Sequence, residues 1–380
     1  MSLYHVLVIG PRRGLIEALR RRGIPFAVWR EKATFSIADA RPLVTAPLWN
    51  STDKLRQIIG ASFGATPCTH VIAGTEAAVY PAAVARRVLG ARRSATTTAL
   101  RCRDKLAMKE YLSGFDIPMT DFMAETSARS AAEAFARLGT PLVRKRRKSS
   151  GGRGLELVHR EQDLVLRKGG RNILERFVSA PEASIESFVN DNQVHFVNTT
   201  RYLEKGHVNF VPSAFDAALL ESLLALNRRV IEALKINWGI THLEVYLTAH
   251  GTLFGEIALR PPGGYIMNAM QYAYAFNPWD ALLAMELGEH FDFPDGVTAY
   301  SCVEIFHPGA GQVAAIRGDD LLRQHPATRE FRLRIQPGDS IGKRESAGQD
   351  IGHLLYTSAT PDARLELYNS FRRQFAIEMK

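Results

Sequence analysis

Residues 241–264 read THLEVYLTAHGTLFGEIALRPPGG, and the rest of the chain is interpreted outward from them. Two short segments, residues 242–248 and 252–259, alternate between apolar and polar side chains around a Gly-containing turn. This pattern predicts a β-hairpin. Glu244 and Glu256 stand on its two arms, and Arg260 follows. Such carboxylates suit Mg²⁺, which takes oxygen ligands and shares them with substrate phosphates. An exposed hairpin with solvated glutamates is the alternative.

The composition is that of a globular enzyme with two or three domains. The chain has 380 residues, of which 46% are hydrophobic and 23% are charged. It has no apolar run of 18 residues, so no transmembrane helix is expected, and its first residues lack the basic region of a signal peptide. Cys68, Cys102 and Cys302 are far apart, which predicts reduced thiols in a cytoplasmic protein, and no Cys/His spacing suggests zinc.

The formal net charge is +9 at pH 7. An excess of basic residues serves either nucleic-acid binding or the binding of small substrates that carry phosphate. The interleaved aromatic residues of an RNA-binding sheet are not evident in the sequence. We therefore expect small-molecule substrates and no nucleic acid.

The first hundred residues predict a small doubly wound α/β domain. Residues 4–10, 14–22 and 24–29 follow a strand–helix–strand pattern, and residues 69–73 add another strand. The turn GPRRG lacks the glycine spacing of a dinucleotide fingerprint. Residues 74–76 either line a ligand crevice or form a plain strand-to-helix turn.

A basic, glycine-rich loop follows further along the chain. Asp104 is a good helix N-cap, and Lys105 lies in the first turn, where a lysine is unfavourable for the helix dipole. Residues 141–145 and 155–159 predict strands that clasp the loop RRKSSGGRG. Glycine lets backbone N–H groups approach phosphate, and the basic residues neutralise its charge. A flexible basic hairpin loop is the alternative.

Several predicted strands surround the hairpin in sequence. Residues 172–178 predict one strand, and residues 194–212 predict two more. Without further context, Glu175, Glu182 and Glu186 would be surface charges. The remaining pattern predicts helices at 219–234, 268–276 and 279–287, then short strands from residue 299 and a terminal helix at 361–378.

In this order the motifs resemble the ATP-grasp superfamily of ATP-dependent carboxylate–amine ligases. The resemblance is greatest to the biotin-carboxylase-like branch that includes L-amino acid ligases. It covers essentially the whole chain and depends on the joint order of the motifs. It implies an ATP-grasp fold of mixed α/β and α+β class. The implied parts are a pre-ATP-grasp domain at 1–100, an ATP-grasp domain at 101–298 with its flap-bearing subdomain at about 140–200, and a C-terminal antiparallel α+β lobe at 299–380.

The resemblance also implies which residues bind ATP. Lys105 and Lys145 match the two lysines that contact phosphates, KSSGGRG resembles the flap, and Glu175-Arg176-Phe177-Val178 resembles the hinge that holds adenine. Glu182 takes the position that usually binds ribose. The implied ATP-binding set is Lys105, Lys145, Ser150, Gly151, Gly152, Glu175, Phe177, Val178 and Glu182.

Metal and substrate residues are implied in the same way. Glu244 and Glu256 match the ligands of Mg²⁺, with Mn²⁺ as an alternative metal, while Arg260 and Lys145 match catalytic groups. Ala258 departs from the family, which often has a metal-binding Asn there. His242 is either a core or supporting histidine or a direct participant. The expected substrate-pocket residues are Arg260, Gly263, Gly264, Met267, Asn268, Arg201 and Tyr202.

The implied activity is ATP-dependent joining of a carboxylate and an amine, with amino-acid-like substrates. The carboxylate forms an acyl phosphate, and ADP and phosphate are released. A biotin-carboxylase-like or purine-pathway enzyme that uses bicarbonate or formate is one alternative. An ATP-binding regulator without catalysis is another, because of Ala258. The expected partners are small molecules, with no membrane; a homodimer is an option, since dimers are common in similar proteins.

Overall fold

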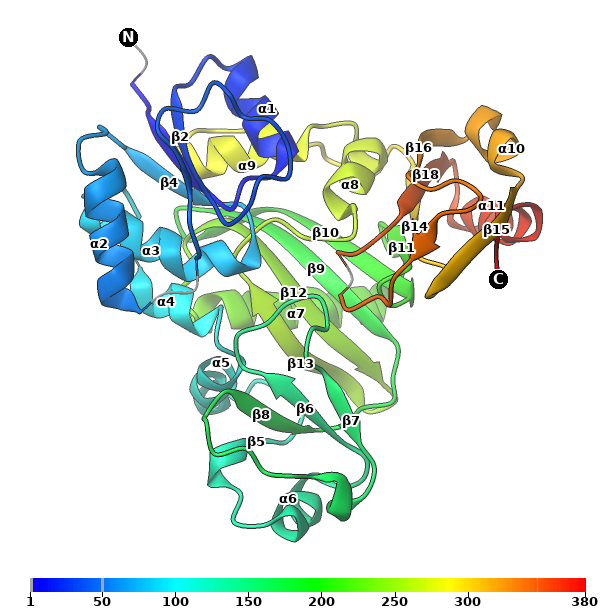
Figure 1. The fold of residues 1–380 in the computed structure, drawn as a ribbon, viewed down its shortest axis with the longest axis horizontal. Coiled ribbons are helices and arrows are strands. Elements are labelled where there is room, and N and C mark those ends of the chain that lie inside the picture. The colour runs from blue at the N-terminus through cyan, green and yellow to red at the C-terminus, as the bar shows by residue number, and fades with distance from the viewer. Residues whose placement is uncertain (1–2, 49–50, 94, 347) are drawn as a thin grey trace.

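The computed structural model describes residues 3–48, 51–93, 95–346 and 348–380 (Figure 1). Its N-terminal lobe is a parallel sheet of four strands in the order β3-β2-β1-β4, which confirms the strand–helix–strand prediction. The strand β3 and the helices α2 and α4 were not predicted. The elements are β1 (Val6–Ile9), α1 (Arg13–Arg21), β2 (Phe26–Arg30), β3 (Leu43–Thr45), α2 (Thr52–Phe63), β4 (His70–Ala73), the 3-10 turn η1 (Glu76–Ala78), α3 (Val79–Val88) and α4 (Thr96–Arg101).

A small antiparallel sheet carries the basic loop. Its strand order is β5-β8-β6-β7, and helix α6 packs on it through a core that includes Ala134, Leu138 and Leu174. The loop joins β6 to β7, as the sequence predicted. The elements are α5 (Lys105–Leu112), β5 (Phe122–Ala124), α6 (Ala131–Leu138), β6 (Leu142–Arg146), β7 (Glu156–Val158) and β8 (Asn172–Arg176), with short 3-10 turns at Ser113–Phe115, Glu125–Ser127 and Glu161–Asp163.

The centre of the molecule is an eight-stranded sheet in the order β13-β12-β9-β10-β11-β14-β18-β16. Strand β9 lies between β10 and β12, and eight of its nine residues are buried, so its glutamate Glu186 is an interior group and not a surface charge. The elements are β9 (Glu182–Asn190), β10 (Gln193–Glu204), β11 (Val208–Val211), α7 (Ala217–Ala233), β12 (Trp238–Thr248), β13 (Gly251–Ala258), α8 (Ile266–Tyr274) and α9 (Pro278–Leu287).

The last eighty residues extend this sheet and add a second one. Strands β14, β18 and β16 continue the central sheet, so its hydrogen bonds cross the expected boundary at residue 299. The division at 1–100, 101–298 and 299–380 stays a prediction. The terminal helix ends at Gln374, because the final residues pair with β15 as a strand. The elements are β14 (Tyr300–Phe306), β15 (Gly311–Arg317), α10 (Asp319–Gln324), β16 (Thr328–Leu333), β17 (Ser340–Ile341), β18 (Gly352–Ser358), α11 (Pro361–Gln374) and β19 (Ala376–Met379).

Helix α9 lies between the N-terminal lobe and the central sheet and joins them (Figure 1). Its Glu286 pairs with Arg86 of α3 at 3.4 Å, and both side chains are at least nine-tenths buried. Arg86 also lies over the Trp238 ring, 5.2 Å from its centroid, which is within the range of a cation–π contact. None of the helices in the described ranges is long and apolar enough to cross a membrane.

We predict that Arg86→Met lowers the free energy of unfolding by about 3–5 kcal/mol, because it leaves Glu286 buried without its ion-pair partner. Urea unfolding followed by circular dichroism measures the change. The double variant Arg86→Met/Glu286→Met should recover most of the loss. A double variant no more stable than the single one would contradict the assignment.

Candidate active site

A cleft of about 580 Å³ opens between the basic loop, the 241–264 hairpin and the C-terminal segment. It brings together residues that are far apart in sequence, from α5, β6, β9, β10, β12 and β13. The predicted residues that line it are Lys105, Lys145, Ser150, Gly151, Gly152, Glu182, Tyr202, Glu244, Glu256, Arg260, Gly263 and Gly264.

The hairpin places its two carboxylates side by side. Glu244 and Glu256 are directly paired across β12 and β13, and the register then shifts at Val245, which pairs with Phe254. Gly255 is therefore the extra residue of a β-bulge. A Cβ at Gly255 would lie 2.9 Å from the Glu244 carbonyl oxygen, so a larger residue would push the strands apart. The glycine thus permits the close approach that the carboxylate pair requires.

Cations surround these carboxylates. Lys105 Nζ lies 2.8 Å from Glu256 Oε2, and Lys205 Nζ lies 3.8 Å from Glu244 Oε2. Lys205 also pairs with Glu182. Burial alone would raise the pKa of Glu244, but the charge of Lys205 and the hydrogen bond from His242 outweigh it, so the pKa is lowered. Glu244 is consequently a carboxylate anion at neutral pH, the form that a metal binds.

The carboxylate pair fits a divalent cation that shares its ligands with a substrate. Both side chains reach the cleft and are about a quarter exposed. Among the described residues, no group of three or more His, Cys, Asp or Glu side chains could form a complete metal cage. Ala258 faces His242 across the hairpin and is buried, so it offers no oxygen ligand. Mg²⁺ commonly binds with one or two carboxylates and takes further oxygens from phosphates and water.

The basic loop lies over the cleft and is tied to it by Lys105. Lys105 Nζ donates to the Ser149 carbonyl oxygen at 3.2 Å. Gly151 and Gly152 have positive φ angles of 62° and 75°, a conformation that strains other residues. Asp104 caps helix α5 as predicted, accepting from the Leu106 and Ala107 amides, and this fixes where the lysine emerges. The loop therefore has the composition and placement of a phosphate-covering flap.

Lys145 belongs to a buried cluster of charges under this flap. Its Nζ lies 2.9 Å from Glu175 Oε2, and Lys109 Nζ lies 3.3 Å from the same oxygen. Burial would raise the pKa of Glu175, but the two lysines lower it to about 2. Burial would likewise lower the pKa of Lys145, whereas Glu175 raises it. Lys145 therefore enters the cleft as a cation held in one position, and Glu175 is not the surface charge that the isolated motif suggested.

Arg260 is held from the N-terminal lobe. Its Nε donates to Glu76 Oε2 at 2.9 Å, and Glu76 Oε1 lies 3.6 Å from Arg103 Nη1. Residues 74–76, for which the sequence left two options, thus supply a side chain that reaches the edge of the cleft. Gly264 adopts a φ of 59°, and a Cβ there would meet Asn209 Nδ2 at 2.8 Å. The glycines after Arg260 let the backbone pass close to strand β11.

A buried hydrogen-bond network supports the metal side of the cleft. The fully buried carboxylate of Glu186 accepts from Ser184 Oγ at 2.6 Å, Asn198 Nδ2 at 2.6 Å and Thr200 Oγ1 at 2.9 Å. It also lies 2.8 Å from His242 Nδ1. Four such partners satisfy most of the acceptor capacity of a carboxylate. The sequence alone gave no indication of this network.

His242 connects the network to the cleft. Its Nε2 lies 3.4 Å from Glu244 Oε1 and 3.4 Å from the Tyr202 hydroxyl. Burial alone would lower the pKa of His242, but Glu186 and Glu244 raise it to about 9. A protonated His242 donates from both ring nitrogens, so it orients Glu244 from behind. Of the two options left by the sequence, this placement favours a supporting role.

Six residues predicted for the site do not line the cleft, and one of them is Glu175, which is buried behind Lys145. Met267 is fully buried in the core, and Asn268 Nδ2 donates to Glu330 at 3.0 Å on strand β16. Arg201 pairs in register with Phe210, on the face of the sheet opposite to Tyr202. Phe177 and Val178 follow β8 in the connection to β9, between the small sheet and the central sheet.

The cleft also contains residues that the sequence analysis did not select. Lys205, Tyr246 and Arg344 line it beside the predicted set. Arg344 reaches it from the C-terminal segment, with Nη2 donating to the Gly206 carbonyl oxygen at 2.8 Å. The sequence analysis expected two strands at residues 194–212 but selected Arg201 and Tyr202 there, not Lys205.

Comparison with known proteins identifies this arrangement. Residues 110–272 match the ATP-grasp domain, and residues 304–380 match L-amino acid ligase C-terminal domain 2. The chain therefore contains an ATP-grasp domain, and it is an ATP-grasp ligase. The L-arginine-specific L-amino acid ligase of Bacillus subtilis is 26% identical over 314 residues, which cover 76% of this chain and 75% of the relative.

Solved structures confirm the ATP-grasp fold. An L-amino acid ligase from Bacillus licheniformis superposes with a TM-score of 0.84 and 18% identity, covering 100% of both chains. A carboxyaminoimidazole ribonucleotide synthase from Aspergillus clavatus, complexed with ATP, gives a TM-score of 0.75 and 18% identity over 98% of this chain and 99% of its own. ATP-grasp enzymes bind ATP or ADP, as the Aspergillus clavatus protein complexed with ATP does.

We predict that the Lys145–Glu175–Lys109 cluster makes stability depend on acid pH. Because the pKa of Glu175 is depressed to about 2, its contribution is complete above pH 4.5 and is lost as the pH falls toward 2. The free energy of unfolding should fall by about 2 kcal/mol more between pH 6 and pH 3 in the wild type than in Glu175→Gln. Urea unfolding at each pH measures the slopes; parallel slopes would contradict the prediction.

Proposed function

We propose that this ATP-grasp ligase joins an amino-acid carboxylate to an amine through an acyl phosphate, releasing ADP and phosphate. One observation carries the proposal: the paired carboxylates Glu244 and Glu256 face the same cleft as Lys105, Lys145 and Arg260. The two carboxylates suit a metal ion bound to a triphosphate, and the lysines and the arginine suit the phosphates and a second anion beside them. The similarity to the Bacillus subtilis ligase supports amino acids as substrates.

In the first step, an oxygen of the substrate carboxylate attacks the γ-phosphorus of ATP. The new O–P bond replaces the bond to the β-phosphate oxygen, and ADP leaves. Lys105 and Lys145 neutralise the phosphate oxygens, and Arg260, held by Glu76, places its planar guanidinium against the developing acyl phosphate. Mg²⁺, which Glu244 and Glu256 would hold, supplies neutralisation of phosphate charge when it is bound. Positioning and electrostatics therefore account for the catalysis.

In the second step, the neutral amine attacks the acyl carbon. The C–N bond forms, the C–O bond to phosphate breaks, and inorganic phosphate carries away the electron pair while the amine loses a proton. Water would hydrolyse the same intermediate, so it has to be excluded. The flap residues Ser150, Gly151 and Gly152 line the cleft and would close over the nucleotide. Phe177 and Val178, in the connection between the two sheets, would hold the adenine by their backbone, and Glu182 would bind the ribose.

The substrate pocket is proposed to lie around Arg260, Gly263, Gly264 and Tyr202, which line the cleft beyond the carboxylate pair. Arg344 replaces the basic residue Arg201 in this assignment, because Arg201 is on the other face of the sheet. We place the protein in the cytoplasm, since its three cysteines are buried and free.

A screen of amino acids against amino acids and simple amines tests the function, with ATP-dependent phosphate release and product mass as readouts. Phosphate release that requires both partners and yields their condensation product is the expected result. Phosphate release that needs bicarbonate or formate and no amino acid would favour a carboxylase-like or purine-pathway reaction. Nucleotide binding without any ADP formation would favour an ATP-binding regulator without catalytic activity.

We predict that Glu256→Gln lowers ADP formation by at least about 100-fold, because one oxygen ligand becomes a neutral amide. Calorimetry with a non-hydrolysable ATP analogue should also show that nucleotide binding loses its Mg²⁺ dependence. The matched control is Glu221→Gln, an exposed position on α7, which should leave both measurements unchanged. Wild-type Mg²⁺ dependence in Glu256→Gln would remove Glu256 from the metal site.

We predict that Glu76→Gln lowers kcat about tenfold or more while the KM for ATP changes much less, because Glu76 positions Arg260 and does not face the nucleotide. Glu17→Gln, at an exposed position of the same lobe, is the control. An unchanged kcat, or an equal rise in the KM for ATP, would contradict the positioning role.

A further inference from the structure

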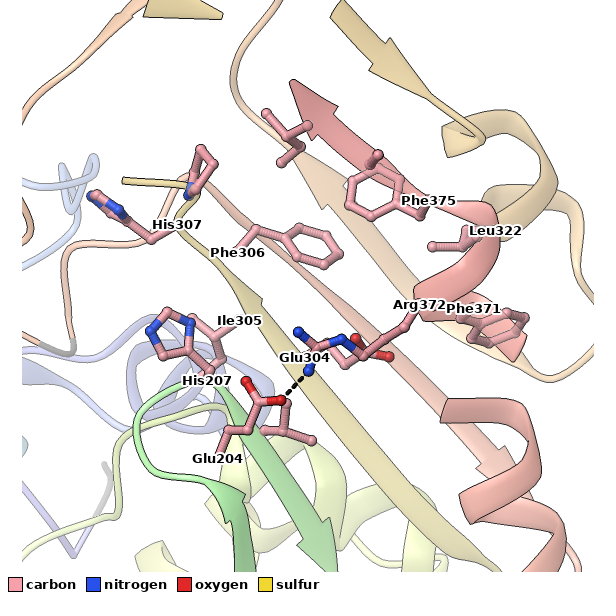
Figure 2. A pocket seen from close by; sticks show the side chains of 14 residues that line it. Glu204, His207, Glu304, Ile305, Phe306, His307, Leu322, Phe371, Arg372 and Phe375 are labelled. Atoms are coloured by element: carbon pink, nitrogen blue, oxygen red, sulfur yellow. Dashed lines mark hydrogen bonds and ion pairs between the residues drawn. The ribbon is translucent and has the colours of Figure 1, made fainter. Parts of the chain in front are cut away.

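A second cavity, of about 260 Å³ (Figure 2), lies beside the nucleotide cleft, and Ile305 of β14 lines both. Val208 of β11 lines this cavity, and the next residue, Asn209, lines the cleft, as expected for neighbours in a strand. Helix α11 closes the cavity with Phe371, and the segment after it contributes Phe375. The volume lies just below the range of about 300–1,000 Å³ typical of ligand pockets, so the cavity suits a small molecule.

About half of the cavity wall is apolar, and charged or polar side chains also line it, namely Glu204, His207, Glu304, His307 and Arg372. Phe306, Phe371 and Phe375 supply aromatic walls, while Glu304 and Glu204 supply carboxylates (Figure 2). Strand β14 places Glu304 directly opposite Val208 of β11. The two glutamates therefore stand next to an aromatic surface, an arrangement that favours a ligand with a charged head and an apolar body.

The two carboxylates differ in their partners. Glu204 is bonded to Arg372 and accepts from the Tyr368 hydroxyl at 2.8 Å. Glu304 Oε1 is buried and has no partner within hydrogen-bond distance among the described residues; the hydroxyl of Tyr356, whose weak interaction lowers the pKa of Glu304, is likewise buried without a partner. Burial raises the pKa of Glu304 to about 7, although Tyr356 and Arg372 act in the opposite direction. A buried carboxylate oxygen without a partner is costly and calls for an explanation.

We propose that this cavity binds a small apolar ammonium compound, with its cationic head on Glu304 and its body against Phe306, Phe371 and Phe375. The charges support a cation: two carboxylates face one arginine, and that arginine is already engaged by Glu204. His207 and His307 add no positive charge at neutral pH, because burial lowers the pKa of each.

The β10–β11 turn, residues 204–208, connects this cavity to the nucleotide cleft. Glu204 and His207 face the cavity, whereas Lys205 and Gly206, between them, face the cleft. Lys205 is the cation beside Glu182 and Glu244. A ligand that reorders Glu204 or His207 therefore shifts Lys205 and changes the charge around the carboxylate pair. The cavity is a regulatory site, and this regulation does not depend on which amine the ligase uses as substrate.

Binding is tested by calorimetry on the full chain with 2-phenylethylamine as the probe. The isosteric alcohol 2-phenylethanol and the anion phenylacetate are the comparison ligands. We expect the amine to bind the wild type at least about tenfold more tightly than either. Glu304→Gln should lose about tenfold or more of the affinity for the amine, while Glu366→Gln, exposed on α11, should lose none.

A second variant distinguishes amine binding in the cavity from amine binding in the nucleotide cleft. Glu256→Gln should bind the amine as the wild type does, since that residue faces the cleft alone. Equal affinities for amine and alcohol in the wild type would overturn the proposal without any need for a variant. So would amine binding that is lost in Glu256→Gln and retained in Glu304→Gln, which would place the amine in the cleft.

Coupling is tested by the affinity for a non-hydrolysable ATP analogue with Mg²⁺, with and without saturating 2-phenylethylamine. A change of about fivefold or more in the wild type, absent in Glu304→Gln, is expected. Amine binding that leaves the nucleotide affinity unchanged would overturn the regulatory role. Because this readout needs no turnover, failure of the proposed ligase reaction and failure of the cavity proposal remain distinguishable.

Discussion

The direct pairing of Glu244 with Glu256 is the constraint on which the rest of the site depends. Like charges placed opposite each other on neighbouring strands repel, and the bulge at Gly255 brings these two closer than a larger residue would allow. The pair is tolerable only because cations surround it. Lys105 and Lys205 approach from other parts of the chain and offset the repulsion. A bound metal would take over part of this neutralisation.

Residues behind the cleft hold the cleft-lining side chains in place. His242 lies behind Glu244 and is itself fixed by Glu186, which is buried in the middle of the central sheet. Arg260 is fixed by Glu76 of the N-terminal lobe, and Lys145 by Glu175. His242, Arg260 and Lys145 are thus each oriented by a carboxylate from another segment. Such preorganisation is what electrostatic catalysis requires.

Short sequence patterns predicted the elements that are formed by residues close together in the chain. The hairpin, the Asp104 cap and the glycine-rich loop each have a signal within a few residues, and the structure confirms those elements. Strand β9 and Glu186 were missed because a glutamate between serines shows nothing of the partners that bury it. Met267 was selected from its closeness to Arg260 in sequence, but only the packing of α8 decides which way it points. Arg344 enters the cleft, and Glu76 reaches Arg260, through tertiary contacts that no short stretch encodes.

The continuous central sheet also determines how the chain could be divided. Strand β14 supplies the hydrogen bonds that cover β11, and β18 pairs in turn with β14; both strands come from the segment after residue 299. Removing that segment would leave β11 as an uncovered edge with Val208 and Phe210 in contact with water. An exposed apolar edge strand pairs readily with other chains. The C-terminal segment is therefore an integral part of the central sheet. By covering β11, it also protects the rest of the molecule from aggregation.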